Sequence, residues 1–198
     1  MKWKLAVVSL VAATALSAKW FVGVEYPFST QLSMKSEMKG QSETEDFDYK
    51  PLVVKVGAGT PGGWNMDVYY ATGKLEFDNY TSDDPLNEIG YDIRREFGLD
   101  SVRGLAPYLQ AGFSIGWMEM QDNDFIYYDQ SVRLNFGLKA GAGIAYLLAE
   151  HFQFLLGVDY KYRVWQDIVY QSADGHDIFT LKTSDSGINL YGGLNLWF

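Results

Sequence analysis

The chain of 198 residues lacks cysteine altogether and contains only two histidines. It can therefore form no disulfide framework and has no thiol chemistry. It also lacks any run of about 18 consecutive apolar residues, the length from which a transmembrane helix is recognised. Basic residues are too few to offset the acidic ones, because 16 lysines and arginines stand against 25 aspartates and glutamates. The net charge of −9 argues against nucleic acid as a partner, since nucleic-acid binding calls for a basic surface.

The first 18 residues have the composition of a secretory signal peptide. Two lysines form the positive start, Leu5–Leu16 forms the apolar segment, and small residues follow. The apolar segment is too short to span a bilayer, so we expect a cleaved peptide. Candidate cleavage points follow Ala15, Ser17 and Ala18, and we favour Ala18. Removal of the two lysines leaves 14 basic residues against 25 acidic ones, a net charge of −11 for a mature domain of residues 19–198.

The segment Val132–Val164 carries the strongest pattern in the chain. Every second residue is apolar from Val132 to Tyr146 and again from Phe152 to Val164, whereas the residues between them are charged, polar or glycine. Strict alternation predicts β-strands with two chemically different faces, and the break between the two series predicts a hairpin. The apolar face runs the whole strand and is rich in aromatic residues. This pattern is typical of a transmembrane β-barrel, with lipid outside and a polar interior.

The same period recurs elsewhere and gives eight predicted strands. They are Trp20–Phe28, Lys50–Gly59, Trp64–Phe77, Ile89–Phe97, Leu105–Met118, Val132–Tyr146, Phe152–Val164 and Ser184–Phe198. The connections alternate between long acidic loops and short turns. The predicted loops are Ser29–Tyr49, Asp78–Glu88, Glu119–Ser131 and Trp165–Thr183. This arrangement predicts an all-β protein, an eight-stranded antiparallel up-and-down transmembrane β-barrel with both termini at the short-turn rim.

Eleven charged residues fall in the inward-facing series of these strands. They are Glu25, Lys55, Asp67, Asp92, Arg94, Glu96, Arg133, Lys139, Asp159, Lys161 and Arg163. Six positive and five negative charges nearly cancel, and the bore of an eight-stranded barrel is only about wide enough for side chains to fill. We therefore predict a lumen charge network that plugs the interior. The alternative is a narrow conductance along this charged column.

The chain ends in an alternating strand, Ile188–Phe198, whose last residue is aromatic. Together with the signal peptide and the loop alternation, this ending resembles that of the small eight-stranded outer-membrane β-barrels, also grouped as the outer membrane protein beta-barrel domain or porin-like family. The resemblance covers residues 19–198 and implies a Gram-negative outer membrane. It also implies that Leu194, Leu196 and Phe198 form the signal read by the barrel-assembly machinery. It implies no single activity, because such barrels host structural, adhesive, pore-forming and enzymatic members.

Enzymatic chemistry finds little support in the sequence. His151 falls in a short turn and His176 in a long loop at the opposite rim, so the two cannot share a metal. No serine is predicted beside His151 to act as a nucleophile. We expect no catalytic residue, cofactor or resident metal. Asp122–Asp124 in the third loop is a weak candidate for Ca²⁺, since no loop has the spacing of a calcium-binding motif. We expect the adjacent apolar segment Phe125–Tyr128 to pack over the barrel mouth, and the alternative is a contact surface for a host or neighbouring surface protein.

The sequence thus favours a non-enzymatic outer-membrane protein with a packed polar interior, which stabilises the envelope or binds through acidic extracellular loops. The expected partners are outer-membrane lipid, lipopolysaccharide, the barrel-assembly machinery and a possible surface ligand. The alternative function is a narrow porin-like channel for small solutes or ions. A soluble barrel would require the opposite facing, with Leu138, Leu156 and Leu194 enclosed and Lys139 and Arg163 on the outer wall.

Overall fold

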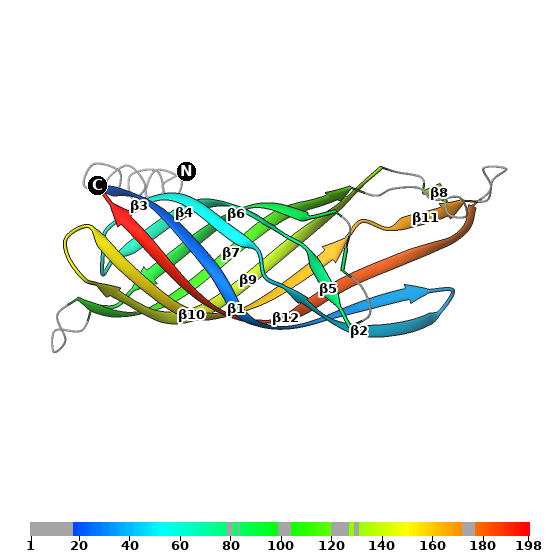
Figure 1. Ribbon diagram of the computed structural model, residues 1–198, viewed down its shortest axis with the longest axis horizontal. Coiled ribbons are helices and arrows are strands. Elements are labelled where there is room, and N and C mark those ends of the chain that lie inside the picture. Colours follow the sequence, from blue (N-terminus) through cyan, green and yellow to red (C-terminus); the bar gives the residue numbers. More distant parts are fainter. Residues whose placement is uncertain are drawn as a thin grey trace, which may run out of the picture.

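Eight antiparallel strands close a ring in the computed structural model, because the first strand pairs with the last (Figure 1). In ring order they are β1 (Lys19–Met38), β3 (Leu52–Gly59), β4 (Trp64–Gly73), β6 (Leu86–Glu96), β7 (Leu105–Glu119), β9 (Val132–Leu147), β10 (Phe152–Trp165) and β12 (Asp177–Trp197). Neighbours in the ring follow one another along the chain. The predicted eight-stranded up-and-down architecture is therefore confirmed.

The structure describes residues 18–78, 81–82, 84–98, 104–119, 127–128, 131–171 and 177–198. The predicted signal peptide, apart from Ala18, lies outside these residues, as do His176 and the candidate segment Asp122–Asp124. The described residues include no helix that is long and apolar enough to cross a membrane.

Four further strands extend the sheet beyond the ring, at the end away from the C-terminus (Figure 1). They are β2 (Gln41–Tyr49), β5 (Leu75–Phe77), β8 (Tyr127–Tyr128) and β11 (Ile168–Gln171). With the outer parts of β1 and β12 they form a curved sheet in the order β5-β2-β1-β12-β11-β8, here called the distal sheet. The loops predicted over Ser29–Tyr49 and Trp165–Thr183 are thus wrong for most of their described residues, which form strands.

A change of phase in β1 separates the ring from the distal sheet. The pairing of β1 with β12 shifts between Pro27 and Ser29, which marks an irregularity of the β-bulge type. Before the shift the buried residues are odd-numbered, from Phe21 to Pro27, and after it they are even-numbered, as at Thr30 and Leu32. The shift turns the apolar even-numbered series from the outer wall to the inside. One strand therefore has an apolar outer face in the ring and an apolar inner face in the distal sheet.

The outer wall of the ring is apolar along its whole circumference. Leu138 and Leu156 expose more than half of their surface, and Phe113, Val56 and Ile188 are also exposed. Arg95 on β6 is the cross-strand partner of Trp64, and its guanidinium carbon lies 5.5 Å from the ring centroid of Trp64 and 5.7 Å from that of Phe97. Both aromatic rings lie at the short-turn rim, so this charge sits at the edge of the apolar wall.

Glycines inside the ring make room for large side chains of the neighbouring strands. Tyr69 and Gly90 are direct cross-strand partners, and a methyl group added to Gly90 would collide with the ring of Tyr69. Asp92 covers its partner Gly112 in the same way. Because large side chains fill the space above these glycines, the interior is packed with polar and aromatic groups although many inward positions are glycine.

Candidate functional site: the lumen and its distal mouth

The eleven charged residues of the predicted lumen network all lie on the inner face of the barrel. Ten are buried, and the side chain of Lys139 is 10% exposed. Arg163 is 1% exposed and Leu138, on the opposite face of the sheet, 53%, which is the facing that a soluble barrel would reverse. Charges enclosed in a low-dielectric interior are costly unless they are paired, so their partners decide what the lumen can do.

Three ion pairs occupy the part of the lumen nearer the short turns. Lys55 on β3 pairs with Glu25 on β1, and Lys139 Nζ on β9 lies 2.7 Å from the Asp92 carboxylate on β6. Arg94 Nε donates to Glu96 Oε1 over 3.1 Å, and the Gln153 amide donates to both Glu96 oxygens over 3.0 Å. The contacts of Lys139 with Asp92 and of Gln153 with Glu96 join strands that are not neighbours in the ring. Lys55 and Glu25 link the adjacent strands β3 and β1, and Arg94 and Glu96 both lie in β6. Side chains therefore fill the centre of the barrel at this level.

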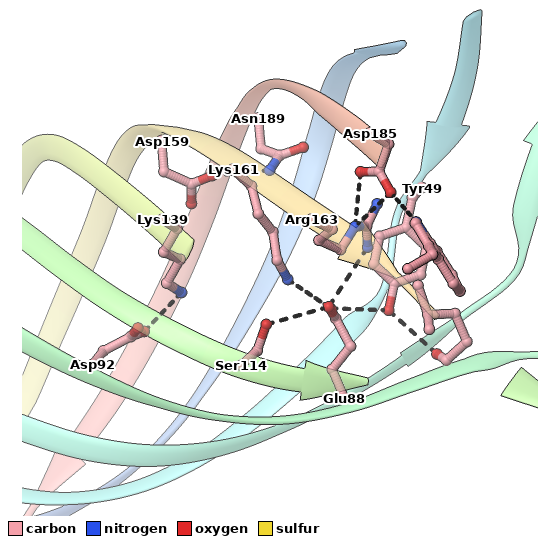
Figure 2. Close-up of polar contacts among 12 residues, drawn as sticks. Tyr49, Glu88, Asp92, Ser114, Lys139, Asp159, Lys161, Arg163, Asp185 and Asn189 are labelled. Atoms are coloured by element: carbon pink, nitrogen blue, oxygen red, sulfur yellow. Dashed lines mark hydrogen bonds and ion pairs between the residues drawn. The ribbon is translucent and has the colours of Figure 1, made fainter. Parts of the chain in front are cut away.

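Glu88 is the centre of a second group of contacts, nearer the distal end (Figure 2). Lys161 Nζ lies 2.7 Å from both Glu88 carboxylate oxygens, and Arg163 Nη1 lies 3.5 Å from Oε1. Arg163 Nε also donates to Asp185 over 2.8 Å, and Trp165 Nε1 donates to the same carboxylate over 2.5 Å. Two carboxylates thus hold two buried cations and an indole. We call Glu88, Lys161, Arg163, Asp185 and Trp165 the distal hub.

The predicted network contains neither carboxylate of the distal hub, Glu88 and Asp185, nor the indole of Trp165. The prediction that Glu88 belongs to the second long loop is wrong, because Glu88 lies in β6 with 1% of its surface exposed. Asp185 was placed in the last strand without a role. A signal for both existed in the sequence. Counting back in steps of two from the inward residue Asp92 reaches Glu88, and the same count from Asn189 reaches Asp185.

An apolar cluster covers the distal hub on the side of the distal sheet. Its buried members come from β1, β2, β5, β6 and β10, and are Leu32, Phe47, Tyr49, Leu75, Leu86 and Trp165. Met34, Phe77 and Met118 pack against them, and the rings of Phe47 and Phe77 stack at 5.4 Å. We call this cluster the distal cap. It is a compact apolar core, such as a soluble domain has, set across the mouth of a polar lumen.

A small cavity of about 60 Å³ remains between the ion pairs and the distal hub, lined among others by Lys139, Asp159 and Tyr191. This volume suits a few water molecules. Several buried polar atoms have no hydrogen-bond partner among the described residues, including Asp67 Oδ1, Asp92 Oδ1 and Asn189 Oδ1. Polar atoms in such surroundings need water to complete their hydrogen bonds.

Arg133 lies apart from the other charges of the network. It is on β9, above the distal cap, and its guanidinium carbon lies 5.0 Å from the ring centroid of Trp165. Nη2 donates to Thr183 Oγ1 over 2.6 Å, and Nε donates to the carbonyl oxygen of Gln166 over 3.3 Å. Both acceptors are uncharged. The structure therefore separates Arg133 from the pairs that the other cations make.

The residues of the expected assembly signal lie at the short-turn end of β12. Phe198 is exposed and its backbone amide donates to the carbonyl oxygen of Trp20 over 2.8 Å, while Leu194 and Leu196 are half-buried on the outer face. His151 is exposed in the turn between β9 and β10. Leu194, Leu196 and Phe198 and this turn thus lie at the end of the barrel away from the distal hub.

The closed ring, its apolar outer wall and its charged interior define the fold of the small eight-stranded outer-membrane β-barrels. The crystal structure of Neisserial surface protein A superposes with a TM-score of 0.56 at 17% sequence identity, over 92% of this chain and 99% of that one. The outer membrane protein AlkL, solved in DMPC lipid bilayers, superposes with a TM-score of 0.54 at 12% identity, over 91% of this chain and 90% of that one. No protein-family model matches the sequence. No curated protein matches it either.

Proposed function

We propose that the protein is a non-enzymatic barrel of a bacterial outer membrane with a closed lumen, and that it acts at the cell surface through its distal sheet. The single observation that carries this proposal is the distal cap. A conducting barrel needs a continuous polar path, whereas Leu86, Phe47 and Trp165 bury apolar side chains across the mouth. Ion pairs on the other side of the cap cross the bore at two levels.

The apolar wall supports the proposed location in an outer membrane. Its exposed leucines, valines and aromatic residues would meet water unfavourably and acyl chains favourably. Membrane lipid and lipopolysaccharide are then the partners of the ring. The terminal strand with Leu194, Leu196 and Phe198 would serve the barrel-assembly machinery during insertion. A signal peptide over residues 1–18 would deliver the chain to the periplasm.

Planar-bilayer recording of the purified, refolded protein tests the closed lumen. We expect no reproducible unitary current steps, because the distal cap and the distal hub place buried side chains across the bore. Steady steps of one size would refute the closed lumen and establish the narrow channel in its place. A variant with Phe47→Ala, Leu86→Ala and Glu88→Ala serves as the positive control, since it removes the cap and the central carboxylate together. That variant should conduct when the native protein does not.

A further inference from the structure

A cleft of about 200 Å³ opens on the concave face of the distal sheet. One part of its wall is apolar and includes Met34 on β1, Ile168 on β11 and Leu181 on β12. Arg133 and Thr183 also line it, and Glu43 and Glu45 of β2 lie at its exposed edge. The cleft therefore combines an apolar wall, one buried cation and an acidic rim.

The charge of Arg133 distinguishes this cleft from the rest of the interior. Lys55, Arg94, Lys139, Lys161 and Arg163 each lie within ion-pair distance of a carboxylate. For Arg133, which is 6% exposed, no ion pair exists among the residues that the structure describes. The carboxylates of Asp167 and Asp185 act on Arg133 from beyond ion-pair distance. A buried guanidinium with no carboxylate in contact is costly, and a bound anion would offset that cost.

We propose that the cleft binds a small organic carboxylate with an apolar body. The carboxylate accepts hydrogen bonds from the guanidinium of Arg133, which is still held by Thr183 and stacked on Trp165. The apolar body packs against Met34, Ile168 and Leu181. This site deepens the proposed surface-binding function and rests on it, because it names the chemistry of the ligand that the distal sheet would take.

The acidic rim limits which anions fit. Glu43 and Glu45 are exposed side chains at the mouth of the cleft, and like charges in apposition repel. A ligand with one negative charge at its inner end and an apolar outer end avoids them. A polyanion such as a sulfated polysaccharide would bring further negative charge against the two glutamates. The cleft volume likewise suits a single small molecule rather than a polymer.

Binding of two matched probes to the full-length protein in nanodiscs of zwitterionic lipid tests the proposal. Hydrocinnamate and phenethylamine share a phenyl ring and a two-carbon linker and differ in the sign of their charge. We expect hydrocinnamate to bind and phenethylamine to show only the background of empty nanodiscs. Arg133→Gln should weaken hydrocinnamate binding by about tenfold or more, since a hydrogen bond to a charged group is lost. Arg133→Lys should fall between them, because it keeps the charge but loses the planar fork.

Arg95→Gln is the control for these variants, because Arg95 lies on the outer wall at the other end of the barrel. It should leave the affinity for hydrocinnamate unchanged. The double variant Glu43→Gln/Glu45→Gln changes only exposed side chains and should tighten hydrocinnamate binding by about twofold or more. It also keeps the test valid if Arg133→Gln does not fold.

Three results would overturn the site: hydrocinnamate binding that is absent, binding that Arg133→Gln leaves unchanged, or equal binding of phenethylamine. Failure of this site and failure of the closed lumen remain distinguishable. Bilayer recording reads the lumen without reference to Arg133, and probe binding reads the cleft without reference to conductance.

Discussion

Lys161 Nζ lies 2.7 Å from both carboxylate oxygens of Glu88, and this contact spans the bore from β10 to β6, two strands that are not neighbours in the ring. The pair therefore links opposite sides of the barrel through its interior and does not belong to the wall. Arg163 reaches the same carboxylate from the next inward position of β10. Removal of the shared carboxylate leaves Lys161 with no ion-pair partner among the described residues.

We predict that Glu88→Gln destabilises the barrel by about 3–5 kcal/mol, the cost typical of leaving a buried charge unpaired. Urea titration followed by heat-modifiable gel migration would measure this change. Glu150→Gln is the matched control, because Glu150 is exposed in a turn. The double variant Glu88→Gln/Lys161→Met should recover part of the loss. If the single and double variants are equally destabilised, the charge of Lys161 is not what Glu88 compensates.

Tyr69 and Gly90 provide a test of interior packing. Gly90→Ala places a methyl group against the ring of Tyr69, and overpacking of this kind costs about 1–3 kcal/mol. In a Tyr69→Leu background the same substitution should cost less, because the ring has gone. Gly192→Ala is the control, since its nearest neighbour is the carbonyl oxygen of Leu155 at 3.9 Å. Additive effects of the two substitutions would contradict direct contact.

The depth of the ring in the bilayer can be measured with lipid-facing charges. Leu138→Arg should destabilise the folded protein in lipid by about 2–4 kcal/mol, whereas Val132→Arg, at the distal end of the same strand, should cost about 0–1 kcal/mol. Unfolding in liposomes would give both values. Equal costs at the two positions would mean that Leu138 does not lie near the bilayer centre.

The distal cap predicts a local effect of Phe47→Ala. Loss of this buried ring removes its stacking on Phe77 and leaves a cavity in the cap. We expect faster amide exchange in β2 and β5, which pair with each other at this position, and no change in β9 and β10. Hydrogen exchange with mass spectrometry distinguishes these peptides. Uniform acceleration in all strands would show that the distal sheet and the ring unfold together.

The sequence predicts the ring well because each membrane strand has one lipid-facing and one lumen-facing series, and a period of two identifies both. It predicts the distal sheet poorly for a physical reason. The phase shift between Pro27 and Ser29 turns the even-numbered residues of β1 inward. Apolar residues at even positions therefore face outward before the shift and inward after it, although their spacing does not change. Leu32 and Met34 therefore carried no sign that they belong to a core. Acidic runs near Glu88 likewise favoured a loop where a strand begins.

The spacing of residues along the chain does not predict which cation pairs with which carboxylate inside the lumen. Inward facing follows from the period of each strand, but the partner of a cation depends on tilt and stagger of strands across the bore. Glu88 and Lys161 are 73 residues apart and Arg163 and Asp185 only 22. Arg133 shares the inward series with Lys139 on β9, and yet only Lys139 finds a carboxylate among the described residues. Local patterns cannot distinguish these two cases.

The length of β1 and β12 has a consequence for what can arrive at the protein. These strands have 20 and 21 residues, about twice the 9–11 that cross a bilayer. The surplus of roughly ten residues, at about 3.3 Å each, carries the tip of the β1–β2 hairpin some 30 Å along the strand direction from the acyl chains. With the ring in an outer membrane, as we propose, a molecule arriving from outside meets the tip of this hairpin before it reaches Arg133, which lies at the distal end of β9.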